Sequence, residues 1–117
     1  MSKPVLYMLN TWHDAQDQGP FYCPDCGIVE GFFIYNPKIK EQVDIIHLDF
    51  QRPRPKIIEQ LGEENQDSPV LVLPDDSVSF DGIKKSMTTG KSFIDDALSI
   101  CNFLGQTYNG ILPHPQD

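Results

Sequence analysis

The 117 residues are enough for a domain with its own core, and we expect a single domain over residues 1–117. Asp and Glu total 17 against 9 Lys and Arg, and the resulting charge of -8 argues against nucleic acid as a partner, because phosphate backbones repel an acidic surface. The three cysteines are too few for a secreted disulfide framework and no apolar run is as long as a signal-peptide core or a membrane span, so we expect a soluble cytoplasmic protein with no membrane partner.

The first predicted elements are a buried strand at residues 5–9 and, after a polar loop at 10–20, a helix that begins at Pro24. Proline suits a first helical position because the missing N–H would have no partner there. Cys23 would cap this helix with its sulfur near unpaired N–H groups, which favours the thiolate, and Cys26 follows one turn later. The apolar stripe of the helix consists of Ile28, Val29, Phe32, Phe33 and Tyr35, before Asn36-Pro37 ends it.

The middle of the chain is predicted to form strand, helix, strand and short strand. Residues 43–50 are rich in aliphatic side chains and indicate a second buried strand. Residues 55–61 begin with proline and carry an apolar face, so they indicate a helix with Gly62 as its C-terminal cap. A third strand that begins with proline is expected at 69–73, and a short fourth strand at 78–83.

The last long helix is expected from about residue 96 to residue 108. Asp95 can cap its start and Gly110 can end it. Its buried stripe consists of Ala97, Ile100, Cys101, Leu104 and Tyr108. The proline-containing tail at 112–117 is expected to be irregular.

This order of elements resembles the thioredoxin superfamily over nearly the whole chain. Tyr22-Cys23-Pro24-Asp25-Cys26 is similar to the active site of glutaredoxins, and Ser68-Pro69-Val70-Leu71 resembles the cis-proline segment of the superfamily. Asp96-Ala97-Leu98-Ser99-Ile100 resembles the helix start that holds the γ-glutamyl group of glutathione. The resemblance implies a single thioredoxin-like α/β domain, with a central four-stranded mixed sheet flanked by about three helices.

A narrower resemblance rests on three short segments. Residues 21–30, Arg52-Pro53-Arg54-Pro55 and residues 62–66 together resemble a bacterial thioredoxin-like family catalogued only as a domain of unknown function. That family brings no established activity.

The dithiol predicts a thiol–disulfide oxidoreductase of glutaredoxin or thioredoxin type. Cys23 is the expected nucleophile and Cys26 the resolving thiol, although the carboxylate of Asp25 opposes thiolate formation. The expected partner is a disulfide-bearing protein or a small thiol. The resemblance implies no tightly bound cofactor and glutathione as a co-substrate, but Ala97 stands where glutathione transferases usually have serine.

Seven further residues are candidates for substrate binding, because loops that follow parallel strands meet at one edge of a sheet. Trp12 could stack on a ligand or close the long loop over the core, and Arg52 and Arg54 could bind a carboxylate or form a solvated rim. Asp95 and Asp96 could bind a glutathione amine or cap a helix. The full set is Trp12, Arg52, Arg54, Ser68, Pro69, Asp95 and Asp96.

Two other functions remain open for the cysteine pair. One is a noncatalytic thioredoxin-like binding module with vestigial thiols. The other is a structural zinc site, which needs two more ligands from among His13, His47 and Cys101. Each of these three residues also has a simpler interpretation. His13 would be an exposed loop residue, His47 a buried histidine with its hydrogen bonds satisfied, and Cys101 a core thiol.

Overall fold

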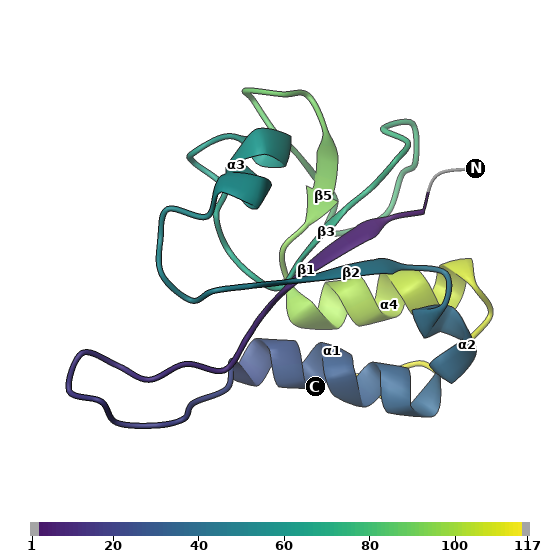
Figure 1. The fold of residues 1–117 in the computed structure, drawn as a ribbon. Coiled ribbons are helices and arrows are strands. Elements are labelled where there is room, and N and C mark those ends of the chain that lie inside the picture. The colour runs from purple at the N-terminus through teal and green to yellow at the C-terminus, as the bar shows by residue number, and fades with distance from the viewer. Residues whose placement is uncertain (1–2, 116–117) are drawn as a thin grey trace.

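The computed structural model describes residues 3–115 of the chain (Figure 1), so residues 116–117 of the predicted irregular tail lie outside the described part. Within residues 3–115 the chain forms five strands and four helices. In chain order they are β1 (Val5–Leu9), α1 (Pro24–Tyr35), α2 (Pro37–Lys40), β2 (Asp44–Leu48), α3 (Pro55–Leu61), β3 (Val70–Val72), β4 (Lys84–Lys85), β5 (Ser92–Ile94) and α4 (Ala97–Thr107). No helix of this stretch is both long enough and apolar enough to cross a membrane.

The strands form one mixed sheet in the order β2-β1-β3-β5-β4. β1 pairs in parallel with β2 and antiparallel with β3, and β5 pairs antiparallel with both β3 and β4. The expected mixed sheet is confirmed, but the described chain has one strand more than the four predicted. It also has one helix more than predicted, because Pro37 starts the short helix α2 directly after α1.

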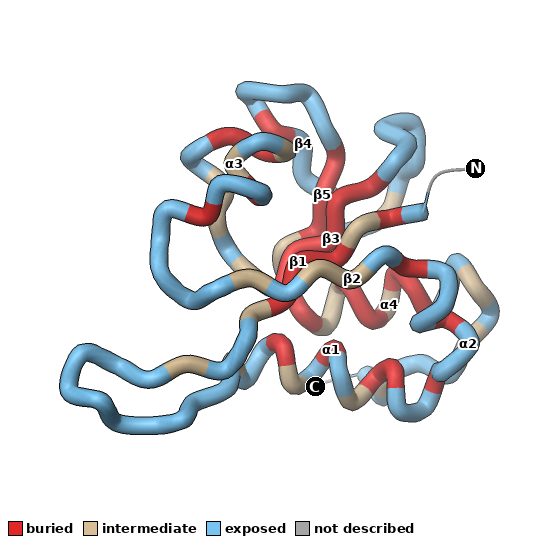
Figure 2. The backbone as a smooth tube through the Cα atoms, viewed as in Figure 1, coloured by how far each residue is buried: buried red, intermediate tan, exposed pale blue. Residues whose placement is uncertain are grey.

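The sheet separates two hydrophobic cores, since successive side chains of a strand point to opposite faces. Leu6 and Met8 of β1 pack into the core covered by α1 and α4, whereas Tyr7 packs with Ile57 and Leu61 of α3 on the other face. Figure 1 shows α3 on one side of the sheet and the α1–α4 pair on the other, and Figure 2 shows the buried strands between them. Because the helices cover the two faces of the sheet, the loops at the ends of the strands are the places where a functional site can form.

Helix α1 begins as predicted. Cys23 is its N-cap with an extended backbone, and Pro24 occupies the first turn. Its apolar stripe is only partly as predicted, because Ile28 and Tyr35 are 42% and 71% exposed. The buried residues of the helix are Cys26, Val29, Phe32 and Phe33.

The prediction of a strand at residues 78–83 is wrong. A hydrogen bond from the Ile83 N–H to the Phe80 carbonyl closes a turn in this stretch, and the sheet continues instead through the hairpin of β4 and β5. The hairpin turn runs from Ser86 to Gly90, whose φ of 77° suits glycine.

The strand predicted at 43–50 is present as β2, but the prediction that it is buried is wrong. β2 lies at the end of the sheet order and its residues are exposed or half-buried. His47 is therefore exposed rather than buried. Sequence alone did not show this, because an edge strand and a central strand can carry the same aliphatic pattern.

Candidate dithiol site

Cys23 lies where three segments meet: the long loop after β1, the start of α1 and the segment before β3. Its sulfur accepts a hydrogen bond from the Cys26 backbone N–H at 3.3 Å, as expected for a residue that caps a helix. Its thiol donates to the Ser68 carbonyl oxygen at 3.8 Å. Cys23 is half-buried and Cys26 is buried, and both are free thiols in this structure.

Cys26 is held as a neutral thiol at neutral pH. Burial, followed by the hydrogen bond and the charge of Cys23, raises the pKa of Cys26 to about 12, although the backbone of Leu9 and the side chain of Ser68 lower it in part. Because the thiolate is the reactive form, Cys26 is unreactive until its surroundings change.

Ser68 and Pro69 form a short wall opposite Cys23. The Ser68–Pro69 peptide bond is cis, as the resemblance implied, and so are Gly19–Pro20 and Arg52–Pro53. The Ser68 hydroxyl donates to the Tyr7 carbonyl oxygen at 2.7 Å, which ties this wall to strand β1.

A cleft of about 530 Å³ lies beside Cys23, within the usual size range of ligand pockets. It brings together six of the seven residues predicted to bind substrate: Trp12, Arg52, Arg54, Ser68, Pro69 and Asp95. Asp96 caps α4 instead, since its Oδ2 accepts from the Ser99 backbone N–H at 3.0 Å. The prediction that Asp95 caps this helix is therefore wrong, and Asp95 forms an ion pair with Lys84 at 3.0 Å.

The two arginines of the cleft are already engaged. Arg54 is only 5% exposed, and its guanidinium donates to the carbonyl oxygens of Phe50 at 2.6 Å and Gln66 at 2.7 Å. Arg52 pairs with Asp67 at 2.9 Å on the surface. Arg52 therefore lies on a solvated rim, as one of the two predicted interpretations had it. Arg54 does not, because its hydrogen bonds join the loop after β2 to the segment before β3.

An aromatic stack forms one side of the cleft. The ring of Trp12 lies on that of Phe50 with centroids 4.2 Å apart and planes 12° from parallel. The guanidinium carbon of Arg54 lies 5.8 Å from the Phe50 ring centroid. The sequence pattern placed Phe50 inside a strand, so its part in the cleft was not predicted, although its position two residues before Arg52 was a usable signal.

A second cavity of about 470 Å³ has both cysteines in its lining, together with Glu30 and His47. His13 is exposed in the loop that projects beyond the sheet (Figure 1). Within residues 3–115 no three side chains of His, Cys, Asp or Glu are grouped so that they could hold a metal ion.

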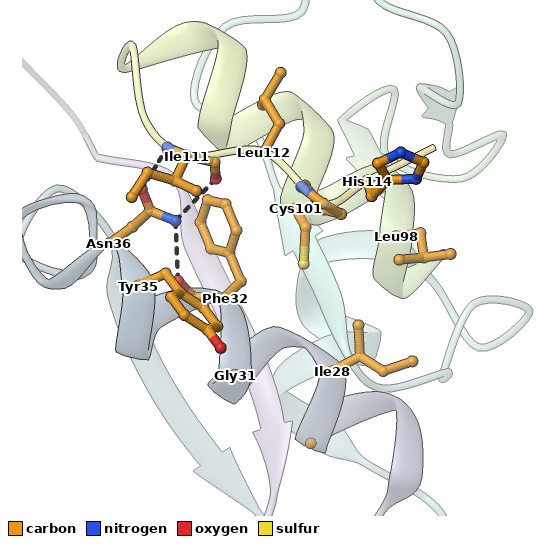
Figure 3. Close-up of a pocket in the computed structure, with 12 residues that line it drawn as sticks. Ile28, Gly31, Phe32, Tyr35, Asn36, Leu98, Cys101, Ile111, Leu112 and His114 are labelled. Atoms are coloured by element: carbon orange, nitrogen blue, oxygen red, sulfur yellow. Dashed lines mark hydrogen bonds between the residues drawn. The ribbon is translucent and has the colours of Figure 1, made fainter. Parts of the chain in front are cut away.

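A third cavity, of about 440 Å³, lies between α1, α4 and the segment after α4 (Figure 3). Asn36 binds this segment to α1, because its amide donates to the carbonyl oxygens of Phe32 and Ile111 and accepts from the Ile111 N–H. Cys101 borders the cavity but is 1% exposed, and burial raises its pKa to about 11. Its burial agrees with the predicted core position.

Comparison with known protein families matches residues 3–111 to the family described as protein of unknown function (DUF3088). No curated protein and no solved structure matches the chain. Because the match covers most of the sequence and includes the dithiol, the chain belongs to the DUF3088 family.

Proposed function

We propose that the protein is a thiol–disulfide oxidoreductase of glutaredoxin or thioredoxin type that acts through Cys23 and Cys26. The observation that carries the proposal is the different placement of the two sulfurs. Cys23 caps α1 beside an open cleft, whereas Cys26 lies one turn further along the helix as a buried neutral thiol. A partly accessible attacking sulfur and a sheltered second sulfur suit two-step disulfide exchange.

The domain is thioredoxin-like in this proposal. Three features support the assignment: the parallel β1–β2 pair, the antiparallel β3 next to β1, and the carbonyl oxygen of Ser68, before β3, facing the cysteine at the start of α1. The hairpin of β4 and β5 follows β3 and precedes the final helix, as an extension of the sheet.

In the first step the Cys23 thiolate attacks one sulfur of a substrate disulfide. A mixed disulfide forms and the other substrate sulfur leaves as a thiolate, which takes up a proton. In the second step Cys26 attacks the Cys23 sulfur, so that the protein disulfide forms and the remaining substrate sulfur leaves with the proton that Cys26 gives up. The protein dithiol loses two electrons and the substrate disulfide gains them, and an external thiol returns the protein to its reduced state.

Thiol reactivity tests this function. The reduced protein is mixed with hydroxyethyl disulfide in the presence of an external dithiol, and turnover is measured. Cys23→Ser should abolish turnover. Cys26→Ser, mixed with hydroxyethyl disulfide without the external dithiol, should accumulate one equivalent of mixed disulfide on Cys23, detected by mass spectrometry. Cys101→Ser is the matched control and should turn over like the parent protein, because Cys101 is buried and does not line the cleft.

A Cys23→Ser protein with full turnover would refute the assigned roles. Absence of exchange in the parent protein would favour the noncatalytic binding module instead. Metal analysis of protein purified without a chelator tests the zinc alternative, since one bound zinc per chain would occupy the sulfurs that exchange requires.

A further inference from the structure

We propose that the substrate of the dithiol is a polypeptide disulfide, and that the stack of Trp12 on Phe50 receives an apolar or aromatic side chain next to the substrate cysteine. A basic residue near that cysteine would complete the recognition. The inference rests on the proposed exchange chemistry and specifies its substrate class as a protein or peptide rather than glutathione.

The stack presents apolar surface to solvent beside the reactive sulfur. Trp12 and Phe50 line the same cleft as Cys23, and Phe50 is 41% exposed although it is a large apolar residue. Phe21, also 41% exposed, packs against Trp12 with ring centroids 6.3 Å apart. Exposed apolar surface that gathers at one place on a small protein usually marks an interaction site.

The stack is built before any substrate arrives. Trp12 and Phe21 exchange two backbone hydrogen bonds, of 3.0 Å and 2.8 Å, which fix the base of the projecting loop. Phe50 is held by Arg54, whose guanidinium donates to its carbonyl oxygen and lies over its ring. A preformed surface needs little ordering on binding, so it can discriminate among substrates effectively.

The groups of the cleft that a substrate can reach suit a cation better than an anion. The carboxylates of glutathione need available cations, but Arg54 uses both terminal nitrogens on backbone carbonyls and Arg52 is paired with Asp67. Asp25, in the first turn of α1, lines the same cleft and makes no ion pair within the described chain. The cleft therefore offers the carboxylate of Asp25 to a substrate, whereas Arg54 is buried and Arg52 is paired with a carboxylate.

The test uses short mixed-disulfide peptides that differ only at the residue next to cysteine, with Phe, Ser, Lys or Glu at that position, and glutathione disulfide beside them. For the parent protein we expect kcat/KM to be roughly tenfold higher with Phe than with Ser, and higher with Lys than with Glu. Glutathione disulfide should be a poorer substrate than the Phe peptide. Equal rates across the peptides, or glutathione disulfide as the best substrate, would overturn the proposal.

Substitutions in the protein test which side chains cause the preference among peptides. Trp12→Ala should bring the Phe-to-Ser ratio close to one, whereas Trp12→Phe, which can still stack, should retain most of it. Asp25→Asn should narrow the Lys-to-Glu ratio. Tyr35→Ala, which removes an exposed aromatic ring at the far end of α1, should leave both ratios unchanged.

The ratio is measured within each variant, so partial unfolding lowers both rates and does not imitate a loss of preference. A Trp12→Ala protein that keeps the parent ratio would refute the role of the stack. If the parent protein reduces peptides and hydroxyethyl disulfide without preference, only this inference fails. If it reduces no disulfide at all, including hydroxyethyl disulfide, the proposed function fails as well.

Discussion

Burial gives the cysteines of this chain different chemical behaviour. Two of the causes that raise the pKa of Cys26 come from Cys23, namely a hydrogen bond and its charge. A mixed disulfide on Cys23 would remove that charge, while the Leu9 backbone and the Ser68 side chain, which lower the pKa, would remain. Cys26 should therefore ionise more readily at the stage of the proposed reaction that requires its thiolate.

Cys101 provides a prediction about stability in alkali. Burial raises its pKa from 9.0 to about 11, so folding favours the neutral thiol. The resulting stability is fully present below pH 9 and is lost as the pH rises through about 11. Over this window we expect Cys101 to account for a fall of on the order of 2 kcal/mol in the free energy of unfolding.

Denaturant unfolding of the reduced protein, repeated at several pH values, measures this fall. Cys101→Ala should lose that part of the pH dependence, while the remaining pH dependence is common to both proteins. The alanine variant should also be less stable at neutral pH by about 1 kcal/mol, because a buried sulfur is removed. Identical pH slopes for the two proteins would show that Cys101 does not titrate in this range.

Local chemistry decided which site residues could be predicted. Cys23 and Pro24 were placed correctly at the start of α1, because capping depends only on neighbouring residues. The burial of Arg54 could not be predicted, since its partners are carbonyl oxygens of Phe50 and Gln66 that only the folded chain brings together. The stacking of Trp12 on Phe50 joins loops from two different strands and escaped prediction for the same reason.

The helices were more predictable than the strands. α1, α3 and α4 follow strong local signals of proline, periodic apolar residues and caps. β4 and β5 have only two and three residues, too few to show an alternating pattern. Residues 78–83 do carry apolar residues, but they form no strand, because the place in the sheet next to β3 is taken by β5.

The start of α4 gives a prediction that separates two adjacent aspartates. Asp96 accepts hydrogen bonds from the backbone N–H and the hydroxyl of Ser99, so Asp96→Ala should lower the free energy of unfolding by about 1 kcal/mol. Asp95→Ala removes only a partly exposed ion pair with Lys84 and should cost roughly half as much. Urea denaturation of both variants at neutral pH measures the difference. A larger loss with Asp95→Ala would mean that Asp95 rather than Asp96 stabilises the helix start.

The topology explains why the site forms at one end of the sheet. β1 and β2 run parallel, so the loops that follow them start from the same edge and carry Trp12 and Phe50 to one place. The segment before β3 approaches from the antiparallel direction and brings Ser68 to Cys23. The meeting of these loops was predictable from the strand order, because it requires only that the first two strands be parallel neighbours.

The charge of the whole chain gives the last prediction. A formal charge of -8 creates a long-range field that attracts cationic disulfides and repels anionic ones, and salt weakens this field as the Debye length falls from about 30 Å at 0.01 M to about 3 Å at 1 M. The rate constant of the reduced protein with cystamine, which is cationic, should therefore fall as salt is added. The rate constant with glutathione disulfide, which is anionic, should rise.

Stopped-flow measurement of both reactions, with neutral hydroxyethyl disulfide as the control that salt leaves unchanged, separates the general field from contacts in the cleft. A preference for cationic substrates that persists at high salt would come from close groups such as Asp25, whose interactions with a bound partner are screened less than the distant charges. The same salt response for all three disulfides would show that the acidic surface does not steer substrates to Cys23.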